Sequence, residues 1–475
     1  MPIVHRLAER FDLTALHQSN PSRYPYLLQS TAQATDQNHF DILFAFPLET
    51  LSLTQHGKLE WQQAPDEAIG NQPSISRELD TANNDFLTAF DHCWQTEQAS
   101  SADPETTTQQ VPFKGGWFLF LGYEVAQQIE PSLQLPVNKA DNLPAAFASR
   151  IPAAVVIDRQ SQAVSIVVEP GYEACIDAIE KDIAQMINGS RQQASSPSDQ
   201  QSIIKSIQEE PAQRYIDGVK QVKRYIKDGD VFQVNLSRWW QAELAGDISH
   251  AQIYRRLMQS NPSPFAALAT IGNNAIISSS PERLVRVRGN RVETRPIAGT
   301  RPRGQSANED ESYLKELIGH PKERAEHIML IDLERNDLGR VCVPGSVNVN
   351  ELMVLETYAH VHHIVSNVQG ELQKDTTPSD VIRAVFPGGT ITGCPKVRCM
   401  EIIGELEQAP RNAYTGSLGY VNHDGSMDLN ILIRTLARHG DRVSLRAGAG
   451  IVADSDPENE LQETRAKAKG LLLAL

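Results

Sequence analysis

Positive charge, paired cysteines and long hydrophobic runs are all scarce in this sequence. Its 475 residues include 44 lysines and arginines against 59 aspartates and glutamates, which gives a formal net charge of −15. A broad contact with a phosphate backbone needs clustered cations, so nucleic-acid binding is not expected. No run approaches the ~20 apolar residues of a membrane span, and the N-terminus has no apolar signal core. We therefore expect a cytoplasmic protein without a membrane partner.

The cysteines are few and badly spaced for a metal or disulfide framework. There are five of them, an odd number, and none forms a CxxC pair: Cys93, Cys175, Cys342, Cys394 and Cys399. A zinc ribbon or a disulfide-stapled fold is therefore not expected. We expect Cys394 and Cys399 to be buried thiols near the start of a helix.

What the sequence does contain is ordinary globular composition, with 40% hydrophobic and 22% charged residues. Its length allows two or three domains, or one large intertwined unit. Residues 189–208 are rich in serine and glutamine and read as a linker or exposed loop. The linker divides the chain into an N-terminal region, residues 1–188, and a C-terminal region, residues 209–475.

Strand-like runs follow one another more often than they alternate with helices. We expect a hairpin between residues 153–158 and 163–169, and a long strand over residues 428–438. Helical spacing of Tyr215, Val219, Val222 and Ile226 predicts a helix that ends at residues 227–230. The pattern favours antiparallel α+β packing over a doubly wound nucleotide fold.

Two predicted helices each present a pair of glutamates three residues apart. Glu323 and Glu326 share one helix face, and Glu460 and Glu463 share another, with Lys467 one turn further on. Four oxygen ligands on two helices suit a hard divalent cation such as Mg²⁺, which takes one or two carboxylates directly and keeps water for the rest. The alternative is that both pairs are solvated helix faces.

Arg434 is the basic residue that most needs a partner. Its neighbours in the run NILIRT are apolar, so the guanidinium requires an anion. That anion is either a bound ligand or a carboxylate of the same chain, and the sequence leaves both open. Tyr414, Thr390 and the backbone around Gly448 and Gly450 are further candidate donors.

A set of segments resembles the chorismate-utilising enzymes, a family that includes anthranilate synthase component I, aminodeoxychorismate synthase component I, and the isochorismate and salicylate synthases. The segments run in unbroken order over about residues 210–470: GDVFQVNLSR, NPSPF, SSPERL, TRPIAGTRPRG, ERAEHIMLIDLERNDLGRV, HHIVS, FPGGTITGCPKVRCMEII, NAYTGSLGY, IRT and AGAGIVADSDPENELQETRAKA. The resemblance implies an α+β fold in which two antiparallel sheets form a sandwich core with helices packed outside.

FQVNLS and NPSPF look most similar to aminodeoxychorismate synthase component I, which makes 4-amino-4-deoxychorismate for para-aminobenzoate and folate. One residue departs from several of those enzymes. They carry a lysine in a PIKGT motif, whereas this chain has PIAGT with Ala298, as anthranilate synthases do. The alternatives are therefore anthranilate synthase component I and, in a different class, a non-catalytic chorismate-binding protein.

The resemblance also implies how chorismate is bound. Mg²⁺ would be held by Glu326 and Glu463 directly and by Glu323 and Glu460 through water, and would bind the ring carboxylate. Lys467 and the backbone of Gly448 and Gly450 would assist it. Arg434 and Tyr414 would bind the enolpyruvyl carboxylate, with Thr390 nearby.

For the chemistry, the resemblance implies that Glu282 is the general acid for the departing C4 hydroxyl, with His363 beside the leaving group. Such a glutamate needs a raised pKa at neutral pH. Gln233 stands where isochorismate and salicylate synthases have a lysine that activates water. A neutral amide cannot be that base, so the nucleophile should be ammonia.

Two partners follow from the same resemblance. The sequence has no glutamine amidotransferase signature, so ammonia should come from a separate glutaminase subunit. The segment YPYLLQS resembles the tryptophan-binding segment of anthranilate synthases, with Gln29 in place of a glutamate. Leu28 and Ser30 would belong to a remnant of that site, either vacant or holding a structural tryptophan.

Overall fold

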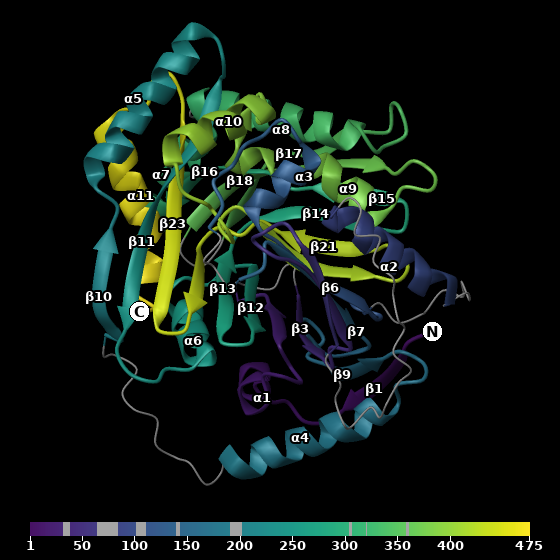
Figure 1. The fold of residues 1–475 in the computed structure, drawn as a ribbon. Coiled ribbons are helices and arrows are strands. Elements are labelled where there is room, and N and C mark those ends of the chain that lie inside the picture. Colours follow the sequence, from purple (N-terminus) through teal and green to yellow (C-terminus); the bar gives the residue numbers. More distant parts are fainter. Residues whose placement is uncertain are drawn as a thin grey trace.

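The computed structural model describes residues 1–31, 39–63, 84–100, 111–138, 143–190, 202–303, 306–319, 321–357 and 361–475. Figure 1 shows strands in two large sheets with helices on their outer sides. Neighbouring strands in both sheets pair antiparallel: examples are β3 with β8 and β20 with β6. The expected α+β class is confirmed.

The first sheet has twelve strands. Its order is β1 (Ile3–Leu7), β9 (Val164–Val168), β8 (Ala153–Asp158), β3 (Phe40–Ala45), β2 (Tyr26–Gln29), β12 (Phe265–Ile271), β13 (Asn274–Ser280), β22 (Thr435–His439), β23 (Arg442–Ile451), β11 (Gln233–Leu244) and β10 (Ile204–Glu209), and β19 (Gly393–Cys394) pairs with β11.

The second sheet has eleven strands. Its order is β16 (Ile297–Pro302), β18 (Val361–Glu371), β15 (Arg291–Thr294), β14 (Arg283–Arg288), β21 (Met427–Asn430), β20 (Ser417–Asn422), β6 (Gly116–Leu121), β7 (Ala146–Ile151), β4 (Glu49–Leu53) and β5 (Leu59–Gln63), and β17 (Asn348–Thr357) pairs with β18.

The sheets face each other across an aromatic core. Successive side chains of a strand point to opposite faces, so Ile42 and Phe44 of β3 face inward while Leu43 and Ala45 face the helices. Opposite them, Phe118 of the second sheet stacks on Tyr26 at a ring-centroid distance of 4.1 Å. This packing is a sandwich of two sheets, as expected.

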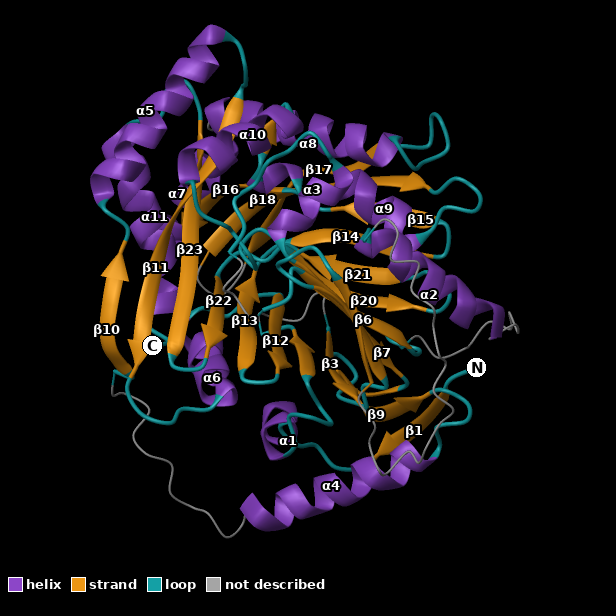
Figure 2. Ribbon diagram, viewed as in Figure 1, coloured by secondary structure: helices purple, strands orange, loops and turns teal. Residues whose placement is uncertain are grey.

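Helices cover the outer faces (Figure 2). Their bounds are α1 (Leu13–Ser19), α2 (Phe86–Ser100), α3 (Ala126–Ile129), α4 (Ala174–Ser190), α5 (Ala212–Asp228), α6 (His250–Ser260), α7 (Ala307–Gly319), α8 (Pro321–Gly339), α9 (Pro378–Val385), α10 (Lys396–Glu407) and α11 (Pro457–Leu472), with short 3₁₀ turns η2 (Tyr123–Val125) and η3 (Gly389–Ile391). Helices α1, α4, α6 and α11 bury apolar side chains against the first sheet, and α2, α8 and α9 against the second.

Several local predictions are confirmed. The helix predicted around Tyr215 is α5, and Gly229 ends it in a left-handed conformation that glycine adopts without steric cost. The predicted hairpin is β8 with β9. All five cysteines are free thiols, but only four are buried: Cys394 is half-buried and lies on the short strand β19 before α10, so the expectation for it was wrong.

The two halves of the chain are intertwined. Each sheet mixes strands from before and after the serine- and glutamine-rich segment, since β2 pairs with β12 and β6 with β20. Of that segment, residues 191–201 lie outside the described residues, and its end is not a loop, because Ile204–Glu209 form β10 on β11.

Candidate active site

Two of the candidate residues lie where the chain crosses from one sheet to the other. Glu282 lies between β13 of the first sheet and β14 of the second, and Arg434 lies between β21 and β22. The crossings hold each other through the backbone. The amide of Ile431 donates to the carbonyl of Glu282 at 3.0 Å, and the amide of Ser279 donates to the carbonyl of Arg434 at 3.0 Å. The fold therefore brings together the backbone segments that carry Glu282 and Arg434 at the junction of the sheets.

Arg434 is not part of a strand, so the expectation of one strand over residues 428–438 was wrong. β21 ends at Asn430 and β22 begins at Thr435, and Arg434 between them has a φ of 54°. A left-handed conformation is uncommon for a residue with a side chain, and it turns Arg434 out of the strand direction.

The guanidinium of Arg434 is partly buried and forms no ion pair with the described residues. Its Nη1 donates to the carbonyl of Lys467 at 3.2 Å, and no carboxylate of the described residues lies within 4.0 Å of it. Burial lowers the pKa of Arg434, although Tyr414 and Glu463 act in the opposite direction. An arginine remains charged even so, and the arrangement leaves a partly buried cation available to an anion.

Two glycines on β23 let side chains lie against this strand. A Cβ on Gly448 would stand 2.8 Å from the hydroxyl of Tyr414, and a Cβ on Gly450 would stand 2.2 Å from Nε2 of Gln233. Any side chain at either position would displace a candidate site residue. The sequence-predicted residues Gln233, Tyr414, Gly448 and Gly450 are thus brought together on one face of the first sheet.

Lys467 joins the same face from α11. Its Nζ donates to the carbonyl of Gly448 at 3.0 Å and forms an ion pair with Glu463 at 2.6 Å. Because the carbonyl of Lys467 also accepts from Arg434, this residue links β23, α11 and the crossing between the sheets.

Glu282 is buried, and burial raises the pKa of its carboxyl group to about 7. The hydroxyl of Thr390 on η3 and the amide of Ile297 approach the carboxyl group and lower the pKa in part. A carboxyl group with a pKa near 7 is protonated in a large fraction of molecules at neutral pH and can release that proton, which is what a general acid requires.

His363 on β18 is also buried. Burial lowers its pKa to about 4, while the backbone of Gly299 and the charge of Glu356 raise it, and Arg434 lowers it further. Gly299 interrupts the pairing of β16 with β18 and has a φ of 68°. The ring is therefore uncharged at neutral pH, and it lies near enough to Arg434 to belong to the same site.

The four candidate metal ligands lie on two helices. Glu326 is on α8, which packs against β16 and β18, and Glu460 and Glu463 are on α11, which packs against β23. The side chain of Glu323 lies outside the described residues. Within the described part of the chain, no three histidine, cysteine, aspartate or glutamate side chains gather closely enough to form a complete metal site.

Sequence reasoning missed a group of residues that holds the site in place. The side-chain amide of Asn235 on β11 donates through Nδ2 to the backbone carbonyl of Thr390 at 2.6 Å. Glu407, at the end of α10, forms ion pairs with Arg411 at 2.6 Å and Arg446 at 2.7 Å. The i, i+4 spacing of Glu407 and Arg411 was the signal available in the sequence. These pairs fix the loop that leads to Tyr414.

A polar hollow of about 970 Å³ opens beside the site. It lies on β11, β22 and β23 and on the loop after α10, and Tyr414, Arg411 and Arg446 are part of its lining. Alternation along β23 puts Arg446 on the same face as Gly448. The hollow therefore reaches a candidate substrate-binding residue from solvent.

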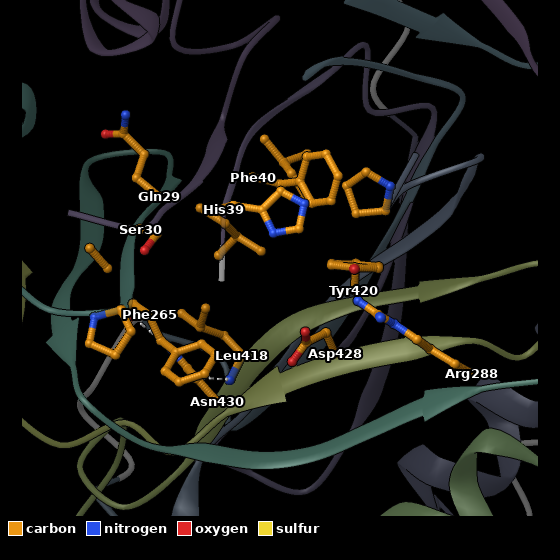
Figure 3. A pocket seen from close by; sticks show the side chains of 15 residues that line it. Gln29, Ser30, His39, Phe40, Phe265, Arg288, Leu418, Tyr420, Asp428 and Asn430 are labelled. Atoms are coloured by element: carbon orange, nitrogen blue, oxygen red, sulfur yellow. Dashed lines mark hydrogen bonds between the residues drawn. The ribbon is translucent and has the colours of Figure 1, made fainter. Parts of the chain in front are cut away.

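A second, separate pocket contains Leu28 and Ser30, the residues of the expected tryptophan-site remnant. Figure 3 shows aromatic and apolar side chains around it, among them Phe40, Phe265 and Tyr420. The hydroxyl of Ser30 is buried and has no hydrogen-bond partner among the described residues. Gln29 is occupied, since its Nε2 donates to Asp41 at 3.3 Å and its Oε1 accepts from Tyr254 at 3.0 Å.

Among the described residues, no helix is long and apolar enough to cross a membrane. The family described as chorismate binding enzyme matches residues 51–473. The chain is 47% identical over 369 residues to the anthranilate synthase component I-like protein of Synechocystis sp., covering 77% of this chain and 74% of that protein.

Two further relatives carry different names. The chain is 42% identical over 397 residues to aminodeoxychorismate synthase component 1 of Bacillus subtilis, covering 82% of each. The crystal structure of anthranilate synthase component I from Streptococcus pneumoniae superposes with a TM-score of 0.74 at 30% identity, covering 92% of this chain and 93% of that one. The relatives thus divide between two activities.

Proposed function

Since this chain belongs to the chorismate binding enzyme family, we propose that it is an aminodeoxychorismate synthase component I. It would convert chorismate and ammonia to 4-amino-4-deoxychorismate and water, on the route to para-aminobenzoate and folate. The Bacillus subtilis relative of that name, similar over most of both chains, supports the assignment.

The observation that carries the proposal is the partly buried guanidinium of Arg434, which forms no ion pair with a carboxylate of the described residues. Chorismate is a dianion, and Arg434 would bind its enolpyruvyl carboxylate through two parallel hydrogen bonds, which also orients the ring. The hydroxyl of Tyr414, held against Gly448, would donate to the same carboxylate. Bound chorismate would supply the anionic partner that Arg434 lacks among the described residues.

Mg²⁺ fits the remaining donors by their chemistry, because carboxylates from two helices and substrate oxygens are the ligands it takes together with water. We assign Glu326 and Glu463 as direct ligands, and Glu323 and Glu460 as ligands through water. The ion, when bound, supplies positive charge for the ring carboxylate in an otherwise acidic neighbourhood. Lys467 of α11 and the backbone of Gly448 and Gly450 on β23 would bind that carboxylate.

Glu282 would be the general acid, since hydroxide is a poor leaving group. Its carboxyl proton passes to the C4 hydroxyl, the C4–O bond breaks, and water leaves. Ammonia then forms the C4–N bond, and the proton that the new ammonium group loses returns to the Glu282 carboxylate. His363, uncharged at neutral pH, would hydrogen-bond at the leaving group, and Thr390 would hold the carboxyl group of Glu282 in place.

Gln233 would determine that the nucleophile is ammonia. Its side chain lies across Gly450 and offers no base to deprotonate water, and ammonia needs none. We propose that a separate glutamine amidotransferase subunit supplies the ammonia. The isolated chain should therefore use ammonium salts at alkaline pH and should use glutamine only when that subunit is added.

Anthranilate synthase component I is the second candidate, and Ala298 favours it. This residue is buried on β16 opposite Ile364 of β18, so position 298 offers no amine that could attack the ring. Amination at C2 followed by loss of pyruvate would then give anthranilate. The Streptococcus pneumoniae and Synechocystis relatives carry that activity in their names.

One assay separates these readings. The purified chain is incubated with chorismate, Mg²⁺ and ammonium, and products are identified by mass spectrometry and fluorescence. A non-fluorescent amino product that keeps the enolpyruvyl group supports the proposal, whereas fluorescent anthranilate with pyruvate release selects the second candidate. Absence of turnover, also with a glutaminase subunit present, would indicate a non-catalytic chorismate-binding protein. Chelation with EDTA should abolish turnover and added Mg²⁺ restore it.

We further propose that the pocket around Leu28 and Ser30 takes tryptophan as a structural ligand. Its aromatic walls and the partnerless hydroxyl of Ser30 suit an amino acid with an indole ring. Gln29 is neutral and turned to Asp41 and Tyr254, which supports stabilisation rather than feedback inhibition. Titration with tryptophan should raise the melting temperature and leave the rate unchanged, whereas inhibition would contradict a purely structural role.

A further inference from the structure

Helix α8 carries two buried carboxyl groups that the mechanism above does not use. Glu334 and Asp337 lie three residues apart, and both are almost fully enclosed. Asp337 forms an ion pair with Lys396 at 2.5 Å, and Lys396 also donates to the carbonyl of Val385 at 3.2 Å. Asp337 therefore has a cation of its own, and Glu334 is the remaining acid.

Glu334 lies near the candidate general acid, close enough for the charge of Glu282 to act on it. Its Oε1 is 3.4 Å from the position that a Cβ on Gly389 would take, next to Thr390 on η3. On its other side, Thr294 at the end of β15 approaches the carboxyl group. Glu334 thus touches both segments that bring donors to Glu282, namely residues 389–390 and 294–297.

The electrostatics make Glu334 a neutral acid. Burial is the largest cause that raises its pKa, and the negative charges of Asp337 on α8 and of Glu282 between β13 and β14 raise it further. Lys396 on α10 and the hydroxyl of Thr294 on β15 lower it, and Gly389 of η3, which carries no charge, lies against it. The net result is a pKa well above the usual range of glutamate, so Glu334 holds its proton at neutral pH.

We propose that Glu334 is a positioning residue for the general acid, and that Glu282 can release its proton only while the nearby buried Glu334 is uncharged. When Glu282 gives its proton to the leaving hydroxyl, it becomes a buried carboxylate. A second carboxylate at Glu334 would place two like charges together in a low-dielectric site. This inference rests on the proposed role of Glu282.

The consequence is a characteristic loss of activity at high pH. In the active form, the carboxyl groups of Glu282 and Glu334 must both be protonated. Two interacting groups of this kind lose their protons in two successive steps. In the wild type, log(kcat/KM) at a constant concentration of free ammonia should fall above pH 7 with a limiting slope of about −2. A single essential acid would give a slope of about −1.

The test is the substitution Glu334→Gln, which keeps the shape of the protonated side chain and removes the ionisation. The variant should keep a pH-7 kcat/KM within about threefold of the wild type, and the slope of its alkaline limb should change from about −2 to about −1. Glu210→Gln is the matched control, because Glu210 is also buried with a raised pKa but faces Arg214 and Arg446. Its alkaline limb should stay as steep as that of the wild type.

A Glu334→Gln limb that stays at the wild-type slope overturns the inference. If that variant does not fold, the wild-type profile decides alone, since a slope of about −1 up to the highest pH the enzyme tolerates contradicts a second ionisation. Failure of the proposed function is a separate result: no amino product forms, or Glu282→Gln keeps its activity. Product formation that depends on Glu282, with a slope of about −1 in the wild type, rejects only the role of Glu334.

Discussion

Two clusters of buried charge lie close together in this molecule, and they are built in opposite ways. In the first, Glu407 accepts from Arg411, Arg446 and the hydroxyl of Ser237. In the second, Arg434 donates only to a backbone carbonyl among the described residues, and burial raises the pKa of Glu282 to about 7. The cluster around Glu407 therefore pairs its carboxylate with cations of the same chain, whereas the described residues offer no such ion pair to Arg434 or Glu282.

The pKa values record the same difference. Despite its burial, Glu407 has a lowered pKa because Arg411 and Arg446 stabilise its carboxylate. Burial instead raises the pKa of Glu282 and lowers that of Arg434. A structural ion pair is complete in the folded chain, whereas a binding site leaves groups that only a ligand completes. Matched substitutions in the two clusters should therefore have different consequences.

The largest effect is expected for Glu282→Gln. Removal of the general acid should lower kcat by about 10²- to 10⁴-fold, measured with chorismate and ammonium. The variant should nevertheless fold. The pKa of Glu282 rises from 4.5 to about 7 on folding, so the folded state binds a proton that the unfolded state releases between these values.

The sign for stability follows from this linkage. Stability of the wild type falls as pH rises from 4.5 to about 7, and the glutamine variant escapes that loss. Glu282→Gln should be more stable than the wild type by up to about 3 kcal/mol at pH 8 and equal to it at pH 4, as measured by urea unfolding. A variant less stable than the wild type at pH 8 would contradict a raised pKa of Glu282.

The same substitution in the other cluster should act on stability. Glu407→Gln leaves Arg411 and Arg446 buried without their carboxylate, which should cost about 3 to 5 kcal/mol in the free energy of unfolding. Residual activity per folded molecule should fall less than in Glu282→Gln, because Glu407 touches no reacting atom. A stability equal to that of the wild type would show that the two clusters do not differ as described.

Substitution of one arginine in each cluster should likewise separate an effect on substrate binding from an effect on stability. Arg434→Met removes a partly buried cation that lacks an ion pair, so stability should stay level or rise, while kcat/KM for chorismate should fall by about 100-fold, mainly through KM. Arg446→Met should instead destabilise, because it leaves Glu407 with one partner fewer. Unfolding curves and steady-state kinetics of the two variants, measured side by side, check both halves. A destabilised Arg434→Met with unchanged KM would make Arg434 a structural residue.

Much of this contrast was accessible from the sequence. Local sequence pattern located α5 and the hairpin of β8 with β9, since amphipathic helices and short paired strands carry their burial pattern locally. Glycines at 448 and 450 and the apolar surroundings of Arg434 pointed to the binding face. The fold class followed from the order of strands and helices, and the family from motifs spread over the second half of the chain.

What sequence reasoning missed depends on contacts between distant segments. The break between β21 and β22 escaped prediction because NILIRT has unbroken strand propensity, while the crossing between the sheets, a tertiary constraint, turns Arg434 left-handed. Glu334 escaped because an acidic residue in a helix usually faces solvent, and only the packing of α8 beneath η3 buries it. Partners that come from other elements leave no local pattern.

The smallest predicted effect tests the role of the uncharged side-chain amide of Gln233. Gln233 lies across Gly450 as an uncharged amide, and Gln233→Lys would place an amine on the same face of β11. Partial burial lowers the pKa of a lysine, so a fraction of this amine would be free base at pH 8 and able to activate water. Isochorismate should then appear as a minor product beside the amino product, detected by mass spectrometry.

Gln233→Met is the control, since it fills the space without a base and should give no hydroxylated product. If folded Gln233→Lys also gives none, the amide at position 233 does not select the nucleophile, and selection must lie with the residues around Glu282.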